Sequence, residues 1–142
     1  MTGSSAVIDA SFAVNSVLPG PLQAICEDIF IELSDFDIAV PTLFLYETTS
    51  ALTKAVRFGE LTAEEGRRML EQVADIPLHL VKTDRALNHS AFEWTLKLGR
   101  AAAYDCYYLA LAESLGCDLW TADRKLARQV DLPWLRFPGE LN

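Results

Sequence analysis

Short apolar runs that end on a polar residue or a proline alternate along this chain with longer stretches of helical periodicity. In the longer stretches, apolar positions recur every three to four residues, as on the buried face of an amphipathic helix. The short runs are apolar on both faces or alternate in polarity, as strands do. Strands are therefore expected over 7–9, 37–41, 76–82, 118–123 and 134–137. Helices are expected over 21–33, 42–59, 61–73, 83–99, 101–116 and 124–130.

Local signals support several of these element ends. Thr62 is followed three residues later by Glu65, which is the spacing of a capping box. Thr42 occupies a cap position before the 42–59 helix, and Gly59 ends it. Pro77 places the 76–82 strand at an edge of the sheet or shortens its start.

Regular alternation of strands and helices predicts the fold class. It is typical of an α/β protein, here a three-layer α/β/α sandwich around a central parallel sheet of about five strands. A length of 142 residues suits a single domain over residues 1–142.

Composition and charge limit the cellular location and the kinds of partner that are expected for this protein. Cysteines are three in number and have no paired spacing, which favours reduced thiols and a cytoplasmic location. The N-terminal apolar stretch is interrupted by Asp9 and Asn15, so it resembles neither a signal peptide nor a membrane span. A net charge of −8 argues against binding nucleic acid by bulk charge. It leaves a metal-dependent nuclease possible, and it suits a basic protein partner.

Two carboxylates follow strands that are expected to lie in one parallel sheet. Asp9 comes directly after the first apolar run, and Asp123 ends the 118–123 strand. Sites in open parallel sheets form outside the carboxyl ends of the strands. If these two strands are neighbours, both side chains face the same crevice.

Two more carboxylates stand alone in apolar helices. Asp105 is the only charged residue from 101 to 112, and Glu47 is the only acid from 38 to 59. A lone carboxylate in such a setting is costly to bury without a partner. Both are therefore candidates for the same crevice.

Each candidate also has an ordinary explanation. Asp9 and Asp123 are able to cap the helices that follow them, and Asp105 suits the first turn of its helix. Glu47 fits an exposed helical position. Ser11 suits a cap or turn, and Thr121 suits a strand.

The four acids together point to a cation, because like charges in one pocket repel each other. Ligand sets made only of oxygen select hard ions such as Mg²⁺ or Mn²⁺. The sequence has no cluster of His and Cys that would indicate zinc.

Four stretches carry a resemblance to a known family. They are "VIDASFAVN", "PTLFLYETTSAL", "YDCYYLALAESLG" and "LWTADRKLA". Their residue types, order and spacing resemble the PIN-domain family, and most closely the VapC-type toxins of toxin–antitoxin pairs. The match runs in order over nearly the whole chain. One variation is Cys106, where the family usually has a smaller residue after its third acid.

The resemblance implies a metal-dependent endoribonuclease. In the family, the acids that match Asp9, Glu47, Asp105 and Asp123 hold Mg²⁺ or Mn²⁺, with the last of them the least uniform. Residues that match Ser11 and Thr121 support the site by hydrogen bonding. A metal-activated water attacks the phosphodiester, and the products carry 5′-phosphate and 3′-hydroxyl ends.

The resemblance also implies partners. VapC-type toxins form homodimers, and a cognate VapB-like antitoxin wraps them with a C-terminal tail that often sends Arg or Lys to the metal site. Arg100 and Arg124 are candidates for RNA selection because they are close in sequence to two of the acids. The aromatic residues Trp94, Tyr104, Tyr107 and Tyr108 are expected to pack rather than to stack on bases.

Three other protein classes need residues that this sequence lacks. A phosphatase of the haloacid-dehalogenase type wants a second Asp where this chain has Ser11, and a receiver domain wants an early acidic pair. A dinucleotide-binding fold would need a glycine-rich loop that the sequence lacks. Two alternatives stay open: a PIN-like binding or assembly module without nuclease activity, and a PIN nuclease that processes RNA without being a toxin.

Overall fold

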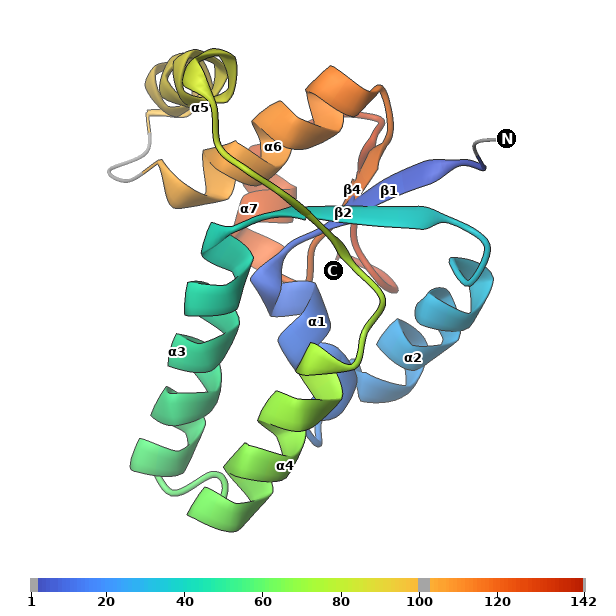
Figure 1. Ribbon diagram of the computed structural model, residues 1–142, viewed down its shortest axis with the longest axis vertical. Coiled ribbons are helices and arrows are strands. Elements are labelled where there is room, and N and C mark those ends of the chain that lie inside the picture. Colours follow the sequence, from blue (N-terminus) through green and yellow to red (C-terminus); the bar gives the residue numbers. More distant parts are fainter. Residues whose placement is uncertain (1–2, 100–102, 142) are drawn as a thin grey trace.

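The computed structural model describes residues 3–99 and 103–141 (Figure 1). All five expected strands are present, most of them shorter than expected. They are β1 (Ser5–Ile8), β2 (Asp37–Pro41), β3 (His79–Val81), β4 (Asp118–Trp120) and β5 (Leu135–Arg136).

Seven helices connect the strands within the described residues. They are α1 (Ala10–Val17), α2 (Gln23–Glu32), α3 (Leu43–Arg57), α4 (Ala63–Ala74), α5 (Arg85–Leu98), α6 (Tyr104–Leu115) and α7 (Arg124–Gln129). Six of them match expected helices, although residues 101 and 102 of the expected 101–116 helix lie outside the described residues. The sequence predicted no element for α1, which starts directly after β1 and is only eight residues long.

The sheet is parallel throughout and has the strand order β3-β2-β1-β4-β5. Successive connections step from β1 to β2 to β3, and the next one returns across the sheet to β4. Because crossovers between parallel strands are right-handed, this reversal puts helices on both faces. In Figure 1, α1 to α4 lie on one face, and α5 and α6 lie on the other. The α/β/α sandwich is therefore confirmed.

The reversal of direction falls between β1 and β4, which are hydrogen-bonded neighbours. In an open α/β sheet, such a switch point leaves a crevice at the carboxyl ends of the two strands, because the following helices diverge. The two strands whose ends carry Asp9 and Asp123 are thus adjacent, as a shared crevice requires.

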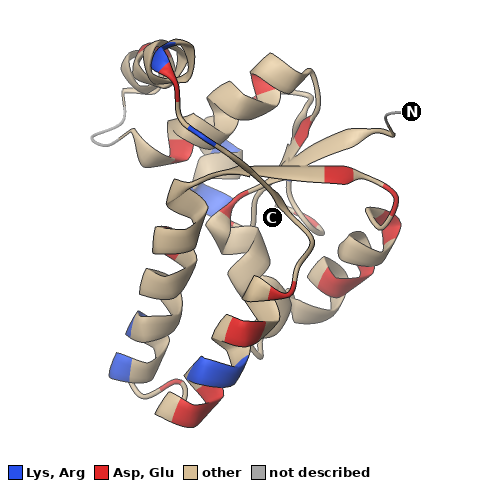
Figure 2. Cartoon of the chain, viewed as in Figure 1, with Lys and Arg blue, Asp and Glu red and all other residues tan. Residues whose placement is uncertain are grey.

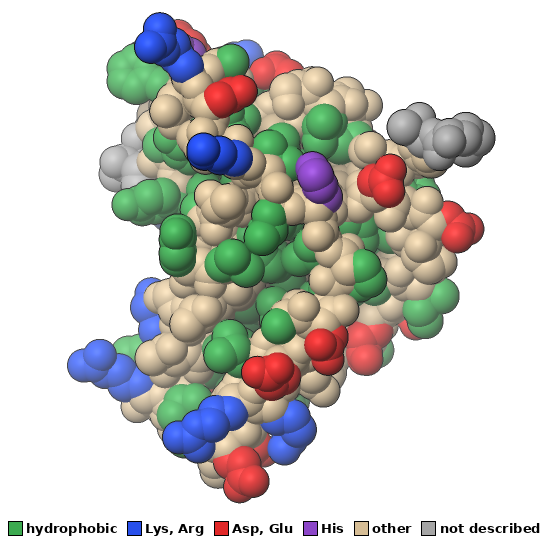
Figure 3. All heavy atoms as spheres, in the orientation of Figure 1, with side chains coloured by type: hydrophobic (Ala, Val, Ile, Leu, Met, Phe, Trp, Pro, Cys, Tyr) green, Lys and Arg blue, Asp and Glu red, His purple; other side chains and the backbone are tan. Residues whose placement is uncertain are grey.

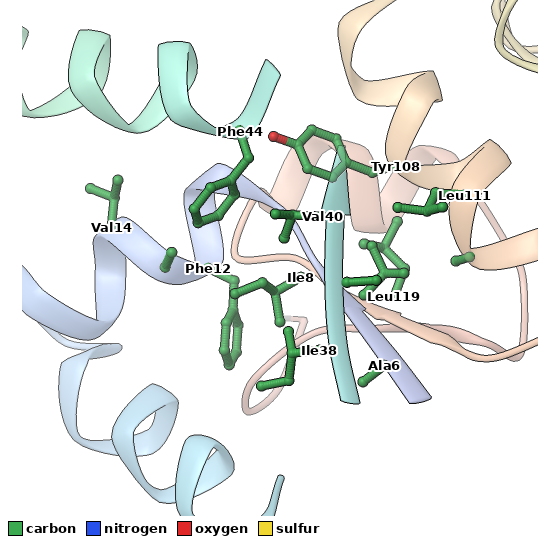
Figure 4. Close-up of a cluster of buried hydrophobic side chains, with 14 of the residues drawn as sticks. Ala6, Ile8, Phe12, Val14, Ile38, Val40, Phe44, Tyr108, Leu111 and Leu119 are labelled. Carbon is green, nitrogen blue, oxygen red and sulfur yellow. The ribbon is translucent and has the colours of Figure 1, made fainter. Parts of the chain in front are cut away.

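The core is built around the central strands. Ala6, Val7 and Ile8 of β1 are at most 1% exposed, which explains why this run is apolar on both faces. Figure 4 shows side chains from the helices of both layers packed against these strands, with Phe44 on one side and Tyr108 on the other. This core fixes the backbone that carries the acids.

Helix ends follow the sequence signals in part. The Thr62 and Glu65 capping box is present, with both reciprocal hydrogen bonds. Thr42 does precede α3, but its side chain makes no capping hydrogen bond because its backbone is already helical. Gly59 adopts a left-handed conformation with φ of 80° just after α3, as expected of a helix-ending glycine.

Cys26, Cys106 and Cys117 are thiols rather than disulfides, and Cys106 is fully buried in the core. Across residues 3–99 and 103–141, none of the helices has the length and apolar character needed to cross a membrane.

Candidate active site

Asp9 lies at the switch point of the sheet. Its backbone N–H donates to the carbonyl of Trp120 at 3.0 Å, so the residue continues the pairing of β1 with β4. Its Oδ1 accepts from the backbone N–H of Phe12 at 2.9 Å and caps α1. The side chain is 5% exposed. The ordinary explanation of Asp9 as a cap is therefore correct, but it does not account for the burial of the charge.

Two hydroxyl groups connect Asp9 to the end of β4. Ser11 Oγ donates to Asp9 Oδ1 at 2.6 Å and accepts from the backbone N–H of Ala122 at 2.9 Å. Thr121 Oγ1 lies 3.3 Å from Ser11 Oγ and accepts from the backbone N–H of Asp123 at 3.1 Å. The Thr121 hydroxyl, like that of Ser11, also lowers the pKa of Asp9 by hydrogen bonding to its carboxylate. Ser11 and Thr121 thus lie beside the acid, where the sequence placed them.

Glu47 comes from the second turn of α3 and is half-buried. Its Oε1 accepts a hydrogen bond from Tyr108 Oη at 2.7 Å. Tyr108 belongs to α6 on the opposite face of the sheet and is 1% exposed. The Glu47 carboxylate is therefore held by a residue from the other layer.

Asp105 lies in the first turn of α6, three residues before Tyr108. Positions three apart share a helix face, so Asp105 and Tyr108 point the same way. The charge of Asp105 raises the pKa of both Asp9 and Glu47. Asp105 therefore acts electrostatically on two carboxylates that come from other parts of the chain.

Asp123 is the N-cap of α7, and its Oδ1 accepts from the backbone N–H of Leu126 at 3.2 Å. Its own backbone is tied to Thr121, next to the Asp9 cluster. The backbone of Asp123 therefore lies next to the Asp9 cluster, and its carboxylate caps α7.

Burial dominates the electrostatics of the site. It raises the pKa of Asp9 from 3.8 to about 6, against the opposing hydrogen bonds from Ser11, Thr121 and Phe12 and with a further increase from Asp105. Burial likewise raises the pKa of Glu47, against the hydrogen bond from Tyr108. Burial and the nearby Glu47 carboxylate raise the pKa of the Tyr108 phenol, so the hydroxyl keeps its proton and donates. Burial and the Asp105 carboxylate therefore both disfavour negative charge at Asp9 and Glu47.

This arrangement coincides with a match to a family model. The model of the PIN domain matches residues 6–132, which span every acid described above. The chain belongs to the PIN-domain family. A sequence relative, Ribonuclease VapC3 of Pyrobaculum aerophilum, is 36% identical over 99 residues, covering 69% of this chain and 71% of the relative.

Solved structures share the PIN-domain fold. VapC20 of Mycobacterium tuberculosis, described as a toxin that cleaves the sarcin–ricin loop, matches with a TM-score of 0.66 and 16% identity over 90% of this chain and 98% of that one. VapBC2 of Rickettsia felis, bound to a DNA fragment from its promoter, matches with a TM-score of 0.66 and 15% identity, over 93% and 96% of the two chains. At these identities, the likeness concerns the fold.

The donor set of this PIN domain fits a hard divalent cation in its chemistry. The candidate ligands are carboxylate oxygens, and a bound Mg²⁺ or Mn²⁺ would relieve the repulsion that Asp105 exerts on Asp9 and Glu47. Within the described part of the chain, no three His, Cys, Asp or Glu side chains are already arranged as a metal site. An ion would therefore have to draw the carboxylates closer together.

The sequence did not predict the hydrogen bond of Tyr108 at the site, and for Arg124 the structure shows contacts within the chain. Tyr108 was expected only to pack, and its hydrogen bond to Glu47 spans 61 residues of chain. The position of Tyr108 one helical turn after Asp105 was the feature of the sequence that could have placed it at the site. Arg124 instead donates to the carbonyl of Glu140 at 3.0 Å and lies over the ring of Phe137. It thus anchors the C-terminal segment, while Arg100 lies outside the described residues.

Proposed function

We propose that this PIN domain is a metal-dependent endoribonuclease and the toxin of a VapBC-type toxin–antitoxin pair. The observation that carries the proposal is the buried Asp9 carboxylate, which shares the crevice at the β1–β4 switch point with Glu47 and Asp105. Folding alone gives no reason to gather these charges, whereas a divalent cation does. The ribonuclease name of the 36% identical relative supports the same conclusion.

Asp9, Glu47, Asp105 and Asp123 would hold Mg²⁺ or Mn²⁺. Bound there, the ion would activate water for attack on an RNA phosphodiester and offset the charge that develops on the phosphoryl group. Ser11 keeps Asp9 oriented through its 2.6 Å hydrogen bond, and Thr121 lies against Ser11. The carboxylates attract the ion rather than the RNA, so substrate binding depends on the ion.

Basic side chains that could contact RNA lie both beside the acids and away from them. Arg124 and Lys125 begin α7 directly after Asp123. Lys54 and Arg57 are in the last turn of α3, and Arg67 and Arg68 are in α4. Figure 2 shows positive charge at the end of the α3–α4 pair that points away from the sheet. With a net charge of −8, the protein would select RNA mainly by shape and local contacts.

The proposed partners are a cognate VapB-like antitoxin and a second copy of the chain, in the cytoplasm. Rickettsia felis VapBC2 and a toxin–antitoxin complex from Klebsiella pneumoniae share this fold. The chain offers apolar surface for such contacts: Figure 3 shows hydrophobic side chains around a hollow in one face of the molecule. A groove of about 570 Å³ between α1, α2 and α4 is lined in part by Val17, Phe30, Ile31 and Met69. A basic antitoxin tail would complement the acidic crevice.

The test is cleavage of total cellular RNA by the purified protein with Mg²⁺, with Mn²⁺ and with chelator. Asp9→Asn is the site variant. Asp84→Asn is the matched control, because Asp84 also caps a helix, accepting from the backbone N–H of Leu87 at 2.8 Å. Metal-dependent cutting that is lost in Asp9→Asn and kept in Asp84→Asn is expected. Equal activity of Asp9→Asn and wild type would favour a binding module without nuclease activity.

A further inference from the structure

The phenol of Tyr108 is a buried polar group at the centre of the acidic crevice. The side chain is 1% exposed, and in Figure 4 it extends from α6 toward the start of α3 with its oxygen foremost. That oxygen donates to Glu47 Oε1 at 2.7 Å. A residue needed only to fill this part of the core would not require a hydroxyl group.

The Tyr108 hydroxyl makes a second contact, so it links the segments that carry the acids. Tyr108 Oη also interacts with the backbone of Ala10, the residue that follows Asp9. The helix that supplies Tyr108 supplies Asp105 one turn earlier. The hydroxyl therefore connects α6 both to Glu47 of α3 and to the corner between β1 and α1.

The neighbouring tyrosine of α6 provides a contrast. Tyr107 Oη donates to Asn88 Oδ1 of α5 at 2.6 Å and so faces away from the acids. The two phenols belong to the same helix and make hydrogen bonds of similar length. Only the bond of Tyr108 is made to a carboxylate of the crevice.

We propose that Tyr108 is a positioning residue whose hydroxyl holds the Glu47 carboxylate toward Asp9 and Asp105, leaving the second carboxylate oxygen for a divalent cation. The inference rests on the proposed function, because it assigns a role at the same metal site. A glutamate side chain has several rotatable bonds, and fixing it before the ion arrives removes an entropic cost from binding. Residues that orient metal ligands typically contribute about 10- to 100-fold to metal affinity.

The experiment compares wild type, Tyr108→Phe and the control Tyr107→Phe, all prepared without metal. Mn²⁺ binding is measured by isothermal titration calorimetry, which does not depend on catalysis. Tyr108→Phe is expected to bind Mn²⁺ about 10-fold more weakly, with Tyr107→Phe within about twofold of wild type. In cleavage assays, the Mn²⁺ concentration for half-maximal rate should rise by the same factor, while the KM for RNA stays constant at saturating Mn²⁺.

A double variant tests whether Tyr108 acts through Glu47. In a Glu47→Ala background, Tyr108→Phe should cause no further loss of Mn²⁺ affinity, because the group that it positions is gone. A further loss of Mn²⁺ affinity of similar size would show that Tyr108 does not act through Glu47. Equal Mn²⁺ affinities of Tyr108→Phe and Tyr107→Phe would overturn the inference while leaving the proposed function intact. If wild type itself binds no Mn²⁺ and cuts no RNA, the proposed function fails and the inference fails with it.

Discussion

The hydroxyl of Ser11 accepts a hydrogen bond from the backbone N–H of Ala122, 111 residues away in the chain, and donates its own proton to Asp9. One small side chain thus joins the ends of β1 and β4 and stabilises the ionised form of Asp9. The Ser11 hydroxyl therefore affects both the structure of the crevice and the charge state of Asp9.

Replacement of Ser11 by Ala should therefore impair both stability and activity. The backbone N–H of Ala122 loses its acceptor and Asp9 loses a donor, which should lower the free energy of unfolding by about 1–2 kcal/mol. Cleavage should fall by about 10-fold, since Asp9 is no longer oriented. Urea unfolding and initial rates of RNA cleavage measure the two effects.

Ser16→Ala is the matched control for this change. Ser16 is a buried serine of the same helix, but its hydroxyl donates to the Ala13 carbonyl within that helix. It should leave the cleavage rate within about twofold of wild type. Loss of activity to the same degree in both variants would mean that Ser11 matters only through stability.

The raised pKa of Asp9 makes the stability of the metal-free protein depend on pH. Because the folded-state pKa of about 6 exceeds the ordinary value of 3.8, the folded state binds more protons than the unfolded state between these pH values. Stability therefore falls as pH rises through this window, and the full loss of about 3 kcal/mol is present above pH 6. Well below pH 3.8, Asp9 is protonated in both states and contributes no loss.

Urea unfolding of wild type and Asp9→Asn in chelator, from pH 4 to pH 7.5, isolates this effect. The stability difference between the two proteins should shift in favour of Asp9→Asn as pH rises. A difference that stays constant over the range would show that Asp9 titrates normally in the folded state.

Divalent metal should reverse the destabilisation at neutral pH. An ion present at 100 times its Kd adds about 2.7 kcal/mol to stability if it binds only the folded state. For a chain of this size, this corresponds to a rise in Tm of roughly 5–10 °C. Differential scanning fluorimetry with Mn²⁺ should show the rise in wild type and Asp84→Asn but not in Asp9→Asn. An equal rise in all three proteins would place the ion elsewhere.

Asp123 caps α7 and is also a proposed metal ligand. The two roles can be separated by mutation, because Asn caps helices about as well as Asp. Asp123→Asn should keep the free energy of unfolding within about 0.5 kcal/mol of wild type, whereas Asp123→Ala should cost about 1 kcal/mol. If the charge of Asp123 serves the metal, Asp123→Asn should still reduce cleavage, although less than Asp105→Asn. Wild-type activity in Asp123→Asn would restrict the residue to its cap.

Packing between α3 and α4 gives a stability prediction that leaves the crevice untouched. A Cβ at Gly66 would lie 2.6 Å from the Val56 side chain, so Gly66→Ala should destabilise by about 1–3 kcal/mol despite the better helix propensity of Ala. Thermal unfolding checks this, and Mn²⁺ affinity below the Tm should be unchanged. Stabilisation instead would mean that α3 and α4 separate easily.

The sequence was sufficient to locate those features that local pattern determines. Asp9 interrupts an apolar run, and Glu47 and Asp105 are isolated acids, so each was visible without knowledge of its neighbours. Whether the acids would meet depended on the adjacency of β1 and β4, which the order of the elements only suggests.

Features that depend on long-range contacts were not visible. Tyr108 lies in an apolar helix, where an aromatic residue is normally a packing residue, and its partner Glu47 is 61 residues away. α1 is too short for a clear helical period, and its signal is the cap that Asp9 provides. Arg124 was placed near RNA by sequence proximity, but its side chain turns to Phe137 and Glu140.

The pairing of β1 with β4 also has a consequence during synthesis of the protein. β1 is synthesised more than 100 residues before residues 118–122, which complete the crevice. Until they emerge, a nascent chain has one open edge of its central strand and lacks the partners of Ser11. Contacts this distant in sequence form late, because a long loop must first close. The crevice is therefore complete only after residues 118–122 have been synthesised and have folded against β1.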